Sequence, residues 1–196
     1  MKSTALILLA AGNSSRMGSP KQLLEFRGVP LIRHAVETAL ASPCSPVIVV
    51  LGANAERVKT AVSDLPVRLV HNERWSEGMG TSIQAGLREA DAEGVDGVVL
   101  ALADQPMVTP HIYDLLVRGH RTSRKPIVAS EYAGTVGVPV YFSREAFPSL
   151  FALAPDQGCK GVILRHGTEA LRIACPEAEA DIDTPGDYER VRAGRI

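Results

Sequence analysis

The stretch Leu8–Lys21, which reads LLAAGNSSRMGSPK, decides how this chain begins to fold. The apolar run Ala5–Leu9 that leads into it predicts a short buried β-strand. The loop after that strand consists mainly of small residues, so its backbone N–H groups can approach an anion closely and form a concave phosphate site. Arg16 adds a planar fork for phosphate oxygens, and Lys21 adds a mobile point charge. The stretch is therefore typical of a nucleotide-phosphate loop.

The glycine spacing of this loop matches neither common nucleotide fingerprint. A P-loop needs G-x-x-x-x-G-K-[ST], but the spacing from Gly12 to Gly18 differs and no Lys-Ser pair follows. The dinucleotide pattern G-x-G-x-x-G is also absent, which disfavours a dinucleotide-dependent oxidoreductase. From the local residues alone, a glycine-containing turn with incidental surface charges remains an alternative to a phosphate site.

Length and composition limit the kinds of protein that the chain can be. Its 196 residues predict one domain over residues 1–196. The net charge of −1 provides no broad basic field, so neither nucleic acid nor a membrane is an expected partner. Three widely separated cysteines predict reduced structural thiols in a cytoplasmic protein. The first residues lead directly into the expected strand and show no signal-peptide cleavage site.

Strand and helix patterns alternate along the chain. Strands are expected at 5–9, 47–51, 67–70, 98–102, 126–129, 138–142 and 171–174. Helices are expected at 30–41, 54–63, 79–92, 109–120, 143–148 and 156–166, and from 184 onward. This alternation predicts an α/β fold, a three-layer αβα sandwich around a mainly parallel sheet. Ligands bind such sheets at the carboxyl ends of the strands, so loops 10–21, 71–80 and 103–107 should meet in one cleft.

Several sequence blocks together resemble the MobA-like nucleotidyltransferase superfamily. The first is Leu9-Ala10-Ala11-Gly12-x-x-x-Arg16-Met17-Gly18-x-x-Lys21, and within it Pro20–Leu24 resembles the molybdenum cofactor cytidylyltransferase (MocA) branch. The others are Asn72–Ile83, Leu102–Val108, Gly137–Phe142 and Asp181–Tyr188. They follow in the order of the family through nearly the whole chain. The resemblance implies a Rossmann-like fold, in agreement with the alternation of strands and helices.

Two aspartates are candidate metal ligands. Asp104 comes just after a strongly apolar strand, which places a carboxylate at the expected cleft, although a solvent-facing turn aspartate is the alternative. Carboxylates are hard oxygen donors that suit Mg²⁺. The resemblance implies that Asp104 is one metal ligand and favours Asp183 as the second, with Asp181 as the alternative second ligand. Asp187 lies where acidic residues also favour the dipole of a helix start.

The resemblance also implies a nucleotide site that prefers CTP to GTP. Arg16 and Lys21 would be catalytic, neutralising charge on the α-phosphate and the leaving pyrophosphate. Alanine at position 11 resembles the cytidylyl branch, whereas the guanylyl branch tends to have glycine there. The expected nucleotide-binding residues are Ala10, Ala11, Gly12, Asn13, Ser14, Arg16, Lys21, Gly78, Gly80, Ser82 and Asp104. For the glycines at 78 and 80, a helix start built from small residues is an equal alternative.

The acceptor side carries weaker signals. Trp75 is the only tryptophan and comes in a polar loop, where its ring could flank a flat pterin. Gln105 and Lys160 are the other expected acceptor-binding residues, and Lys160 could equally be a surface lysine. The chain departs from the family pattern at 155–159 and at Val138, which puts the exact acceptor in doubt.

The resemblance as a whole implies a Mg²⁺-dependent transfer of CMP from CTP to the phosphate of the molybdopterin (molybdenum) cofactor, with release of pyrophosphate. A molybdoenzyme or its maturation chaperone would be the protein partner. The first alternative is a relative that uses GTP or another phosphorylated acceptor, such as a guanylyltransferase or a sugar-phosphate nucleotidyltransferase. The second is a non-catalytic nucleotide-binding protein that delivers a cofactor.

Overall fold

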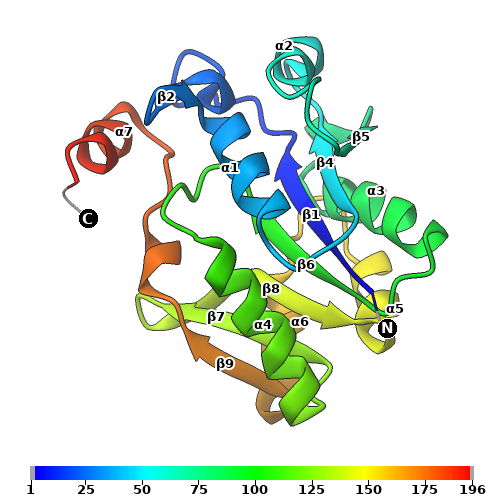
Figure 1. The fold of residues 1–196 in the computed structure, drawn as a ribbon. Helices are drawn as coiled ribbons and strands as arrows, with labels where there is room; N and C mark the ends of the chain where they lie inside the picture. Colours follow the sequence, from blue (N-terminus) through cyan, green and yellow to red (C-terminus); the bar gives the residue numbers. More distant parts are fainter. Residues whose placement is uncertain (1–2, 195–196) are drawn as a thin grey trace.

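The computed structural model describes residues 3–194, and its centre is a seven-stranded sheet (Figure 1). The strand order is β5-β4-β1-β6-β8-β7-β9. Strand β8 runs antiparallel to both of its neighbours, and the other pairs are parallel. The strands are β1 Thr4–Ala10, β4 Val47–Leu51, β5 Arg68–His71, β6 Gly97–Leu102, β7 Ile127–Tyr132, β8 Thr135–Ser143 and β9 Ala170–Ala174.

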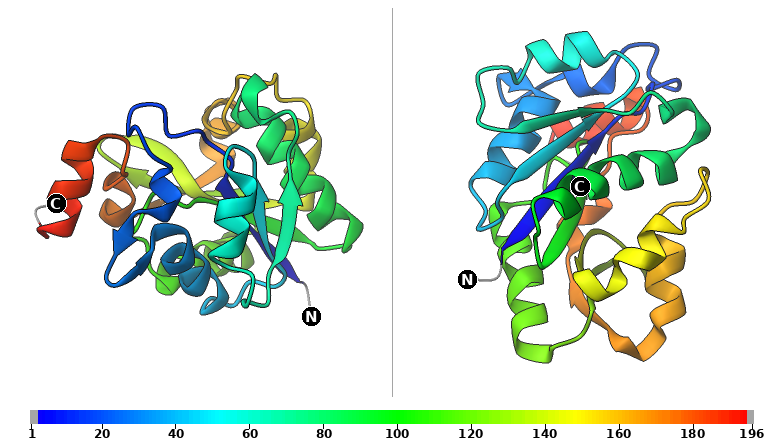
Figure 2. Two further views of the ribbon diagram at one scale, coloured as in Figure 1. Left: turned by 90° about the horizontal axis from the view of Figure 1, so that it is seen from above. Right: turned by 90° about the vertical axis from the view of Figure 1, so that its right-hand side faces the viewer.

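Helices cover both faces of this sheet, as the alternation predicted (Figure 2). They are α1 Leu31–Leu40, α2 Ala55–Thr60, α3 Met79–Ala92, α4 Pro110–Ser123, α5 Phe147–Phe151, α6 Lys160–His166 and α7 Pro185–Arg192. Strand β1 shows the layering most clearly. Ala5, Ile7 and Leu9 pack into one core with α3, α5 and α6. Leu6, Leu8 and Ala10 pack into the other core with α1, α2 and α4.

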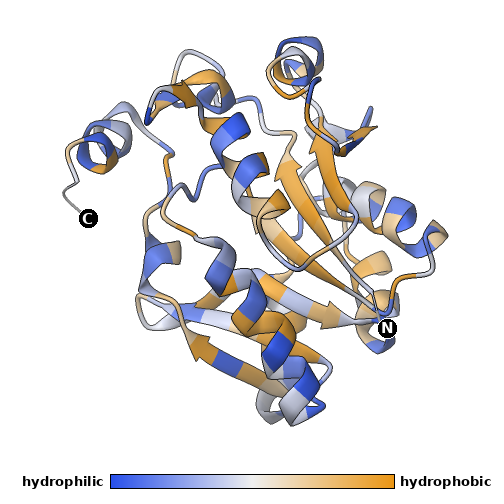
Figure 3. Cartoon of the chain, viewed as in Figure 1, coloured by the Kyte–Doolittle hydropathy of each residue, from blue (hydrophilic) through white to orange (hydrophobic). Residues whose placement is uncertain are grey.

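The central strands β1 and β4 are apolar except for Thr4, because neither face meets water (Figure 3). All seven residues of β1 are buried, and so are all five of β4. The three-layer α/β sandwich expected from the sequence is therefore confirmed. Within residues 3–194, no helix combines the length and the apolar character that crossing a bilayer requires.

Two hairpins were not anticipated from the sequence. Strands β7 and β8 are longer than expected and are joined by Ala133-Gly134, both with positive φ, the conformation of a tight hairpin turn. A second hairpin joins β2 (Glu25–Phe26) to β3 (Val29–Pro30) through Arg27-Gly28, again with positive φ. This small hairpin connects the loop after β1 to helix α1.

Some helix starts also differ from expectation. Asn54 precedes α2 with a φ of 60° and makes no capping bond through its side chain. Helix α6 begins at Lys160 and not at Asp156. In contrast, Thr184 caps α7 through a complete capping box with Asp187. This box lies next to one of the candidate metal ligands.

The order of connections opens a crevice beside β1. The chain moves from β1 to β4 and β5 on one side, and later returns to β6 on the other side. Such a reversal separates the loops at the carboxyl ends of β1 and β6, which is where ligands bind in open α/β sheets. Helix α3 follows the loop after β5 and packs on β1 and β4.

Gly86 lets α3 approach the sheet this closely. A Cβ at this position would lie 2.5 Å from Cγ2 of Ile7 and 2.9 Å from Cγ2 of Val50.

We expect Gly86→Ala to lower the free energy of unfolding by about 1–3 kcal/mol through overpacking. Gly161→Ala in α6 is the matched control, because a Cβ there meets only the end of Arg165 at 3.5 Å. It should be neutral or stabilising by up to about 1 kcal/mol. Urea unfolding of both variants tests this, and equal effects would refute the packing argument.

Candidate active site

A cavity of about 450 Å³ opens at the carboxyl edge of the sheet, beside β1 and β6. The three loops expected to converge, after β1, β5 and β6, all contribute to its wall. A fourth segment, Asp181–Asp183 after β9, completes it. The wall carries two cations, Arg16 and Lys21, and three carboxylates, Asp104, Asp181 and Asp183.

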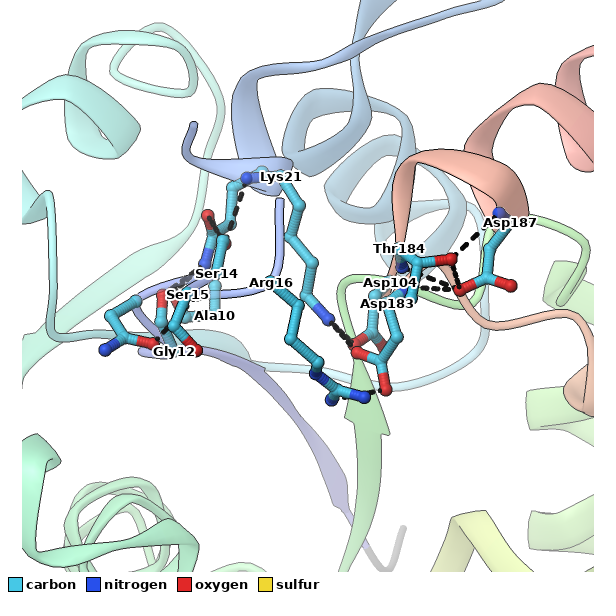
Figure 4. Close-up of polar contacts among 12 residues, drawn as sticks. Ala10, Gly12, Ser14, Ser15, Arg16, Lys21, Asp104, Asp183, Thr184 and Asp187 are labelled. Carbon is cyan, nitrogen blue, oxygen red and sulfur yellow. Dashed lines mark hydrogen bonds and ion pairs between the residues drawn. The ribbon is translucent and has the colours of Figure 1, made fainter. Parts of the chain in front are cut away.

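One ammonium group joins two of these carboxylates (Figure 4). Nζ of Lys21 donates to Oδ2 of Asp104 at 2.6 Å and to Oδ1 of Asp183 at 2.7 Å. Nη2 of Arg16 donates to the other oxygen of Asp183 at 2.8 Å. The side chains of Lys21 and Asp104 are 15% and 17% exposed, whereas that of Arg16 is 67% exposed. The pairs of Lys21 are therefore the partly desolvated centre of the site, and Arg16 reaches in from solvent.

The charges shift the pKa values of the groups that share the cavity. Burial lowers the pKa of Lys21, but the charge and hydrogen bond of Asp104, together with Asp183, outweigh it and raise the pKa overall. Burial raises the pKa of Asp183, but Lys21 and Arg16 outweigh it and hold the pKa below its usual value. Burial, with the negative charges of Asp183 and Asp104, raises the pKa of Asp181. Lys21 and Asp183 are thus held in their charged forms.

One oxygen of the Asp104 carboxylate lacks a partner, and this makes Asp104 suitable as a metal ligand. Its Oδ2 accepts from Lys21, but its Oδ1 is buried and has no hydrogen-bond partner within the described chain. A buried, unpartnered anionic oxygen is costly unless another donor or a cation completes it. No group of three or more His, Cys, Asp and Glu side chains in residues 3–194 is arranged to hold a metal alone. Asp104 and Asp183 therefore suit a cation that takes its remaining oxygens from a bound phosphate and water.

Backbone contacts fix Asp183 opposite Asp104. The N–H of Ile182 donates to the carbonyl of Asp104 at 3.0 Å, and the Ile182 side chain is fully buried. Oδ2 of Asp187 accepts from the N–H of Asp183 at 3.1 Å and from the N–H of Thr184 at 2.6 Å. Asp187 is therefore the first-turn partner of Thr184 in the capping box and orients Asp183, in line with its expected place at a helix start.

The loop after β1 is shaped by hydrogen bonds that the sequence did not reveal. Ser14 has a φ of 56°, and its Oγ accepts from the N–H of Lys21 at 3.0 Å. Nε2 of Gln22 donates to the carbonyls of Ala10 and Gly12 at 3.2 and 2.8 Å. Gln22 was not among the predicted site residues. The signals in the sequence were its place directly after the candidate phosphate loop and its membership of the Pro20–Leu24 block.

The β4 side of the cavity has a closely packed wall. A Cβ on Gly52, at the end of β4, would lie 2.6 Å from Cβ of Trp75 and 2.8 Å from Cβ of Ala11. Trp75 is half-buried and lines the cavity with Ala11. Because β4 and β6 lie on opposite sides of β1, Trp75 stands across the cavity from Asp104.

Of the three residues predicted around the start of α3, two line the cavity and one does not. Gly78 and Ser82 line the cavity, and Oγ of Ser82 accepts from Nδ2 of Asn72 at 2.9 Å. Gly80 is buried outside the cavity wall, where a Cβ would lie 2.2 Å from the carbonyl of Ala154. Close packing against the loop before α6 is therefore what requires glycine at position 80.

Four other predicted residues also lie outside the cavity wall. Asn13 and Ser14 belong to the outer part of the loop after β1. Gln105 is buried, and its Nε2 donates to the carbonyls of Val138 and Ala178 at 3.2 and 2.8 Å, so it joins three segments beneath the site. Lys160 is exposed at the start of α6.

The ammonium of Lys21 should stabilise the protein in the absence of any ligand. We expect Lys21→Met to lower the free energy of unfolding by about 2 kcal/mol, because it leaves two partly buried carboxylates without their shared donor. Arg16→Met should change it by less than about 1 kcal/mol, since that ion pair is exposed. Urea unfolding in the presence of a chelator measures both. A Lys21→Met variant as stable as the wild type would contradict this description of the site.

Comparison with known proteins identifies the family. The MobA-like NTP transferase domain matches residues 6–170. The purine catabolism protein PucB of Bacillus subtilis is 33% identical over 95% of this chain and 94% of its own length. Nicotine blue oxidoreductase of Paenarthrobacter nicotinovorans is 42% identical over 60% of this chain and 57% of its own length.

Solved structures agree in fold. Rv0371c of Mycobacterium tuberculosis is 29% identical, covers 98% of both chains and superposes with a TM-score of 0.85. A manganese complex of Rv0371c is 27% identical, covers 98% of this chain and 99% of that one, and has a TM-score of 0.81. The nucleotidyl transferase of Methanothermobacter thermautotrophicus is 25% identical, with 98% and 97% coverage and a TM-score of 0.81. The chain belongs to the MobA-like NTP transferase family.

Proposed function

We propose that this nucleotidyltransferase transfers CMP from CTP to the phosphate of the molybdopterin (molybdenum) cofactor, releases pyrophosphate and depends on Mg²⁺. The observation that carries the proposal is the junction of Lys21 with Asp104 and Asp183 at the mouth of the β1–β6 crevice. In such a transfer both reactants are anions, so positioning and charge neutralisation make up most of the catalysis. The junction brings together a cation and the two carboxylates that we propose as metal ligands.

The chain's own residues would act mainly through charge. Arg16 is exposed at the cavity wall, where its planar fork can bind phosphate oxygens of the incoming triphosphate. Lys21 has a flexible stem, so its ammonium can leave the carboxylates and follow the phosphates. Asp104 and Asp183 would hold Mg²⁺, which neutralises phosphate charge when bound. The acceptor phosphate is already ionised at neutral pH and needs no general base.

The preference for CTP rests on the β4 side of the cavity. Ala11 and Trp75 line the cavity there and pack against Gly52 with no space for a Cβ, which limits the room for a base. We therefore propose that Trp75 flanks the base, a different role from the acceptor contact expected from the sequence. Ser82 provides a hydroxyl on the same side of the cavity. The alanine at position 11, which resembles the cytidylyl branch, supports the same choice.

The acceptor half contains no basic side chain of its own within the described cavity wall. Both cations, Arg16 and Lys21, come from the loop after β1, and the opposite wall presents Asp104, Asp181 and Asp183. An acceptor phosphate that approaches this acidic wall would be repelled unless a metal ion lies between them. The proposal therefore requires Mg²⁺ for binding of the acceptor as well as for transfer. The pterin identity of the acceptor is supported by the sequence resemblance to the MocA branch.

Pyrophosphate release tests the proposal directly. Purified protein is incubated with CTP or GTP, Mg²⁺ and molybdenum cofactor, and the nucleotide product is identified by mass spectrometry. We expect CTP to be preferred, and Asp104→Asn to lower the rate at least about 100-fold. Arg33→Met, which removes an ion-pair network on α1 that is not part of the cavity wall, should leave the rate unchanged.

Each other outcome overturns a defined part of the proposal. Faster turnover with GTP would make the protein a guanylyltransferase. Turnover with a sugar phosphate but not with molybdenum cofactor would replace the acceptor. Tight CTP binding without pyrophosphate release would indicate a non-catalytic nucleotide-binding protein.

A second candidate function is an oxidoreductase, because one relative that is 42% identical over 60% of the chain carries that name. The absence of G-x-G-x-x-G argues against binding a dinucleotide in the usual way. Oxidation of NADH or NADPH in the presence of nicotine blue, followed by absorbance, distinguishes the two functions. Dye reduction that persists in Asp104→Asn would favour the oxidoreductase.

A further inference from the structure

We infer that Gln22 is a positioning residue that holds the phosphate loop in its binding shape, an inference that rests on the proposed nucleotide site. The side chain of Gln22 is nearly fully buried, yet it forms part of the cavity wall. It therefore lies directly beneath the loop that carries Arg16 and Lys21.

Every polar group of the Gln22 amide is used on this one loop. Nε2 donates to the carbonyls of Ala10 and Gly12 at 3.2 and 2.8 Å, and Oε1 accepts from Oγ of Ser14 at 3.2 Å. The same Ser14 oxygen accepts from the N–H of Lys21 at 3.0 Å (Figure 4). The end of β1, the turn and the start of the Lys21 segment are thus tied to a single side chain.

These bonds determine which way the loop's backbone groups point. Because a peptide unit is planar and trans, drawing the carbonyl of Gly12 toward Gln22 turns the N–H of Asn13 to the opposite side of the loop. Ser14 is held at a φ of 56°, a conformation that non-glycine residues adopt only when their surroundings impose it. Gln22 and its bond to Ser14 provide that constraint.

A loop that already has its binding conformation loses little conformational entropy when it binds a triphosphate. Loss of the Gln22 donors would leave two carbonyls free to turn, and the loop would then sample other shapes. The expected effect is weaker nucleotide binding, with little change in the transfer step once the nucleotide is bound.

The alternative is that Gln22 contributes only to stability, and Gln84, a half-buried glutamine, is the control for losing two side-chain bonds to carbonyls. Nε2 of Gln84 also donates to two carbonyls, those of Phe151 and Leu153 at 3.0 and 2.9 Å. That pair of bonds ties α3 to the end of α5, and Gln84 is not part of the cavity wall. The two glutamines make the same kind of bonds, and only Gln22 contacts the phosphate loop.

The experiment compares Gln22→Met with Gln84→Met, since methionine keeps the length of the side chain and removes its donors. Calorimetry with CTP and Mg²⁺ gives Kd, and steady-state kinetics give KM and kcat. We expect Gln22→Met to raise Kd and KM about 10- to 100-fold with kcat within about 3-fold. Gln84→Met should leave Kd within about 2-fold of the wild type, even where both variants lower Tm.

A readout without nucleotide separates this inference from the proposed function. Backbone ¹⁵N order parameters of residues 12–16 should fall from about 0.85 toward 0.6 in Gln22→Met and stay unchanged in Gln84→Met. Ser14→Ala, at a half-buried position, weakens the same network while leaving the donors of Gln22 in place. It should lower the same order parameters by a smaller amount.

Unchanged order parameters in Gln22→Met and Ser14→Ala would overturn the inference, as would an equal loss of CTP affinity in Gln84→Met. If Gln22→Met does not fold, the Ser14→Ala order parameters decide alone. A wild type that binds no CTP would refute the proposed nucleotide, while the order parameters would still decide the role of Gln22.

Discussion

Two carboxylates that lie at the same edge of a sheet repel each other, and the ammonium of Lys21 is what allows Asp104 and Asp183 to remain there. The attraction is strong because the three groups are partly withdrawn from water, where charges interact through a lower dielectric. Arg16 adds a second, solvent-exposed cation to the same carboxylate of Asp183. The loop after β1 thus carries the positive half of the site, and the segments after β6 and β9 carry the negative half.

The strand order and several backbone hydrogen bonds hold Asp104 and Asp183 close to Lys21. The reversal of strand order at β1 places the loops after β1 and β6 across one crevice. The bond from Ile182 to the carbonyl of Asp104 and the capping box of Thr184 with Asp187 hold Asp183 in place. A site built from segments so distant in sequence therefore depends on the packing of the whole sheet, which is why the close approach of α3 at Gly86 matters for the cavity.

The central strands and the position of Asp104 were predictable from the sequence because both follow from local patterns. Short apolar runs gave the central strands, and the position of Asp104 directly after such a run placed it at the cavity. The β7–β8 hairpin was missed because its turn, Ala133-Gly134, is not one of the strong hairpin dipeptides such as Asn-Gly, and a short apolar run carries no sign of its direction. Gln22 was missed because its role depends on carbonyls that fold back over it.

The carboxylates of Asp104 and Asp183 hold Lys21 in the free protein, and we propose that they hold a metal ion once the nucleotide is bound. Titration of Mn²⁺ followed by electron paramagnetic resonance tests this most directly, with and without CTP. We expect weak binding to the wild type alone, tighter binding once CTP draws Lys21 away, and tighter binding to Lys21→Met even without CTP. Identical Mn²⁺ affinities for the wild type, Lys21→Met and Asp104→Asn would contradict it.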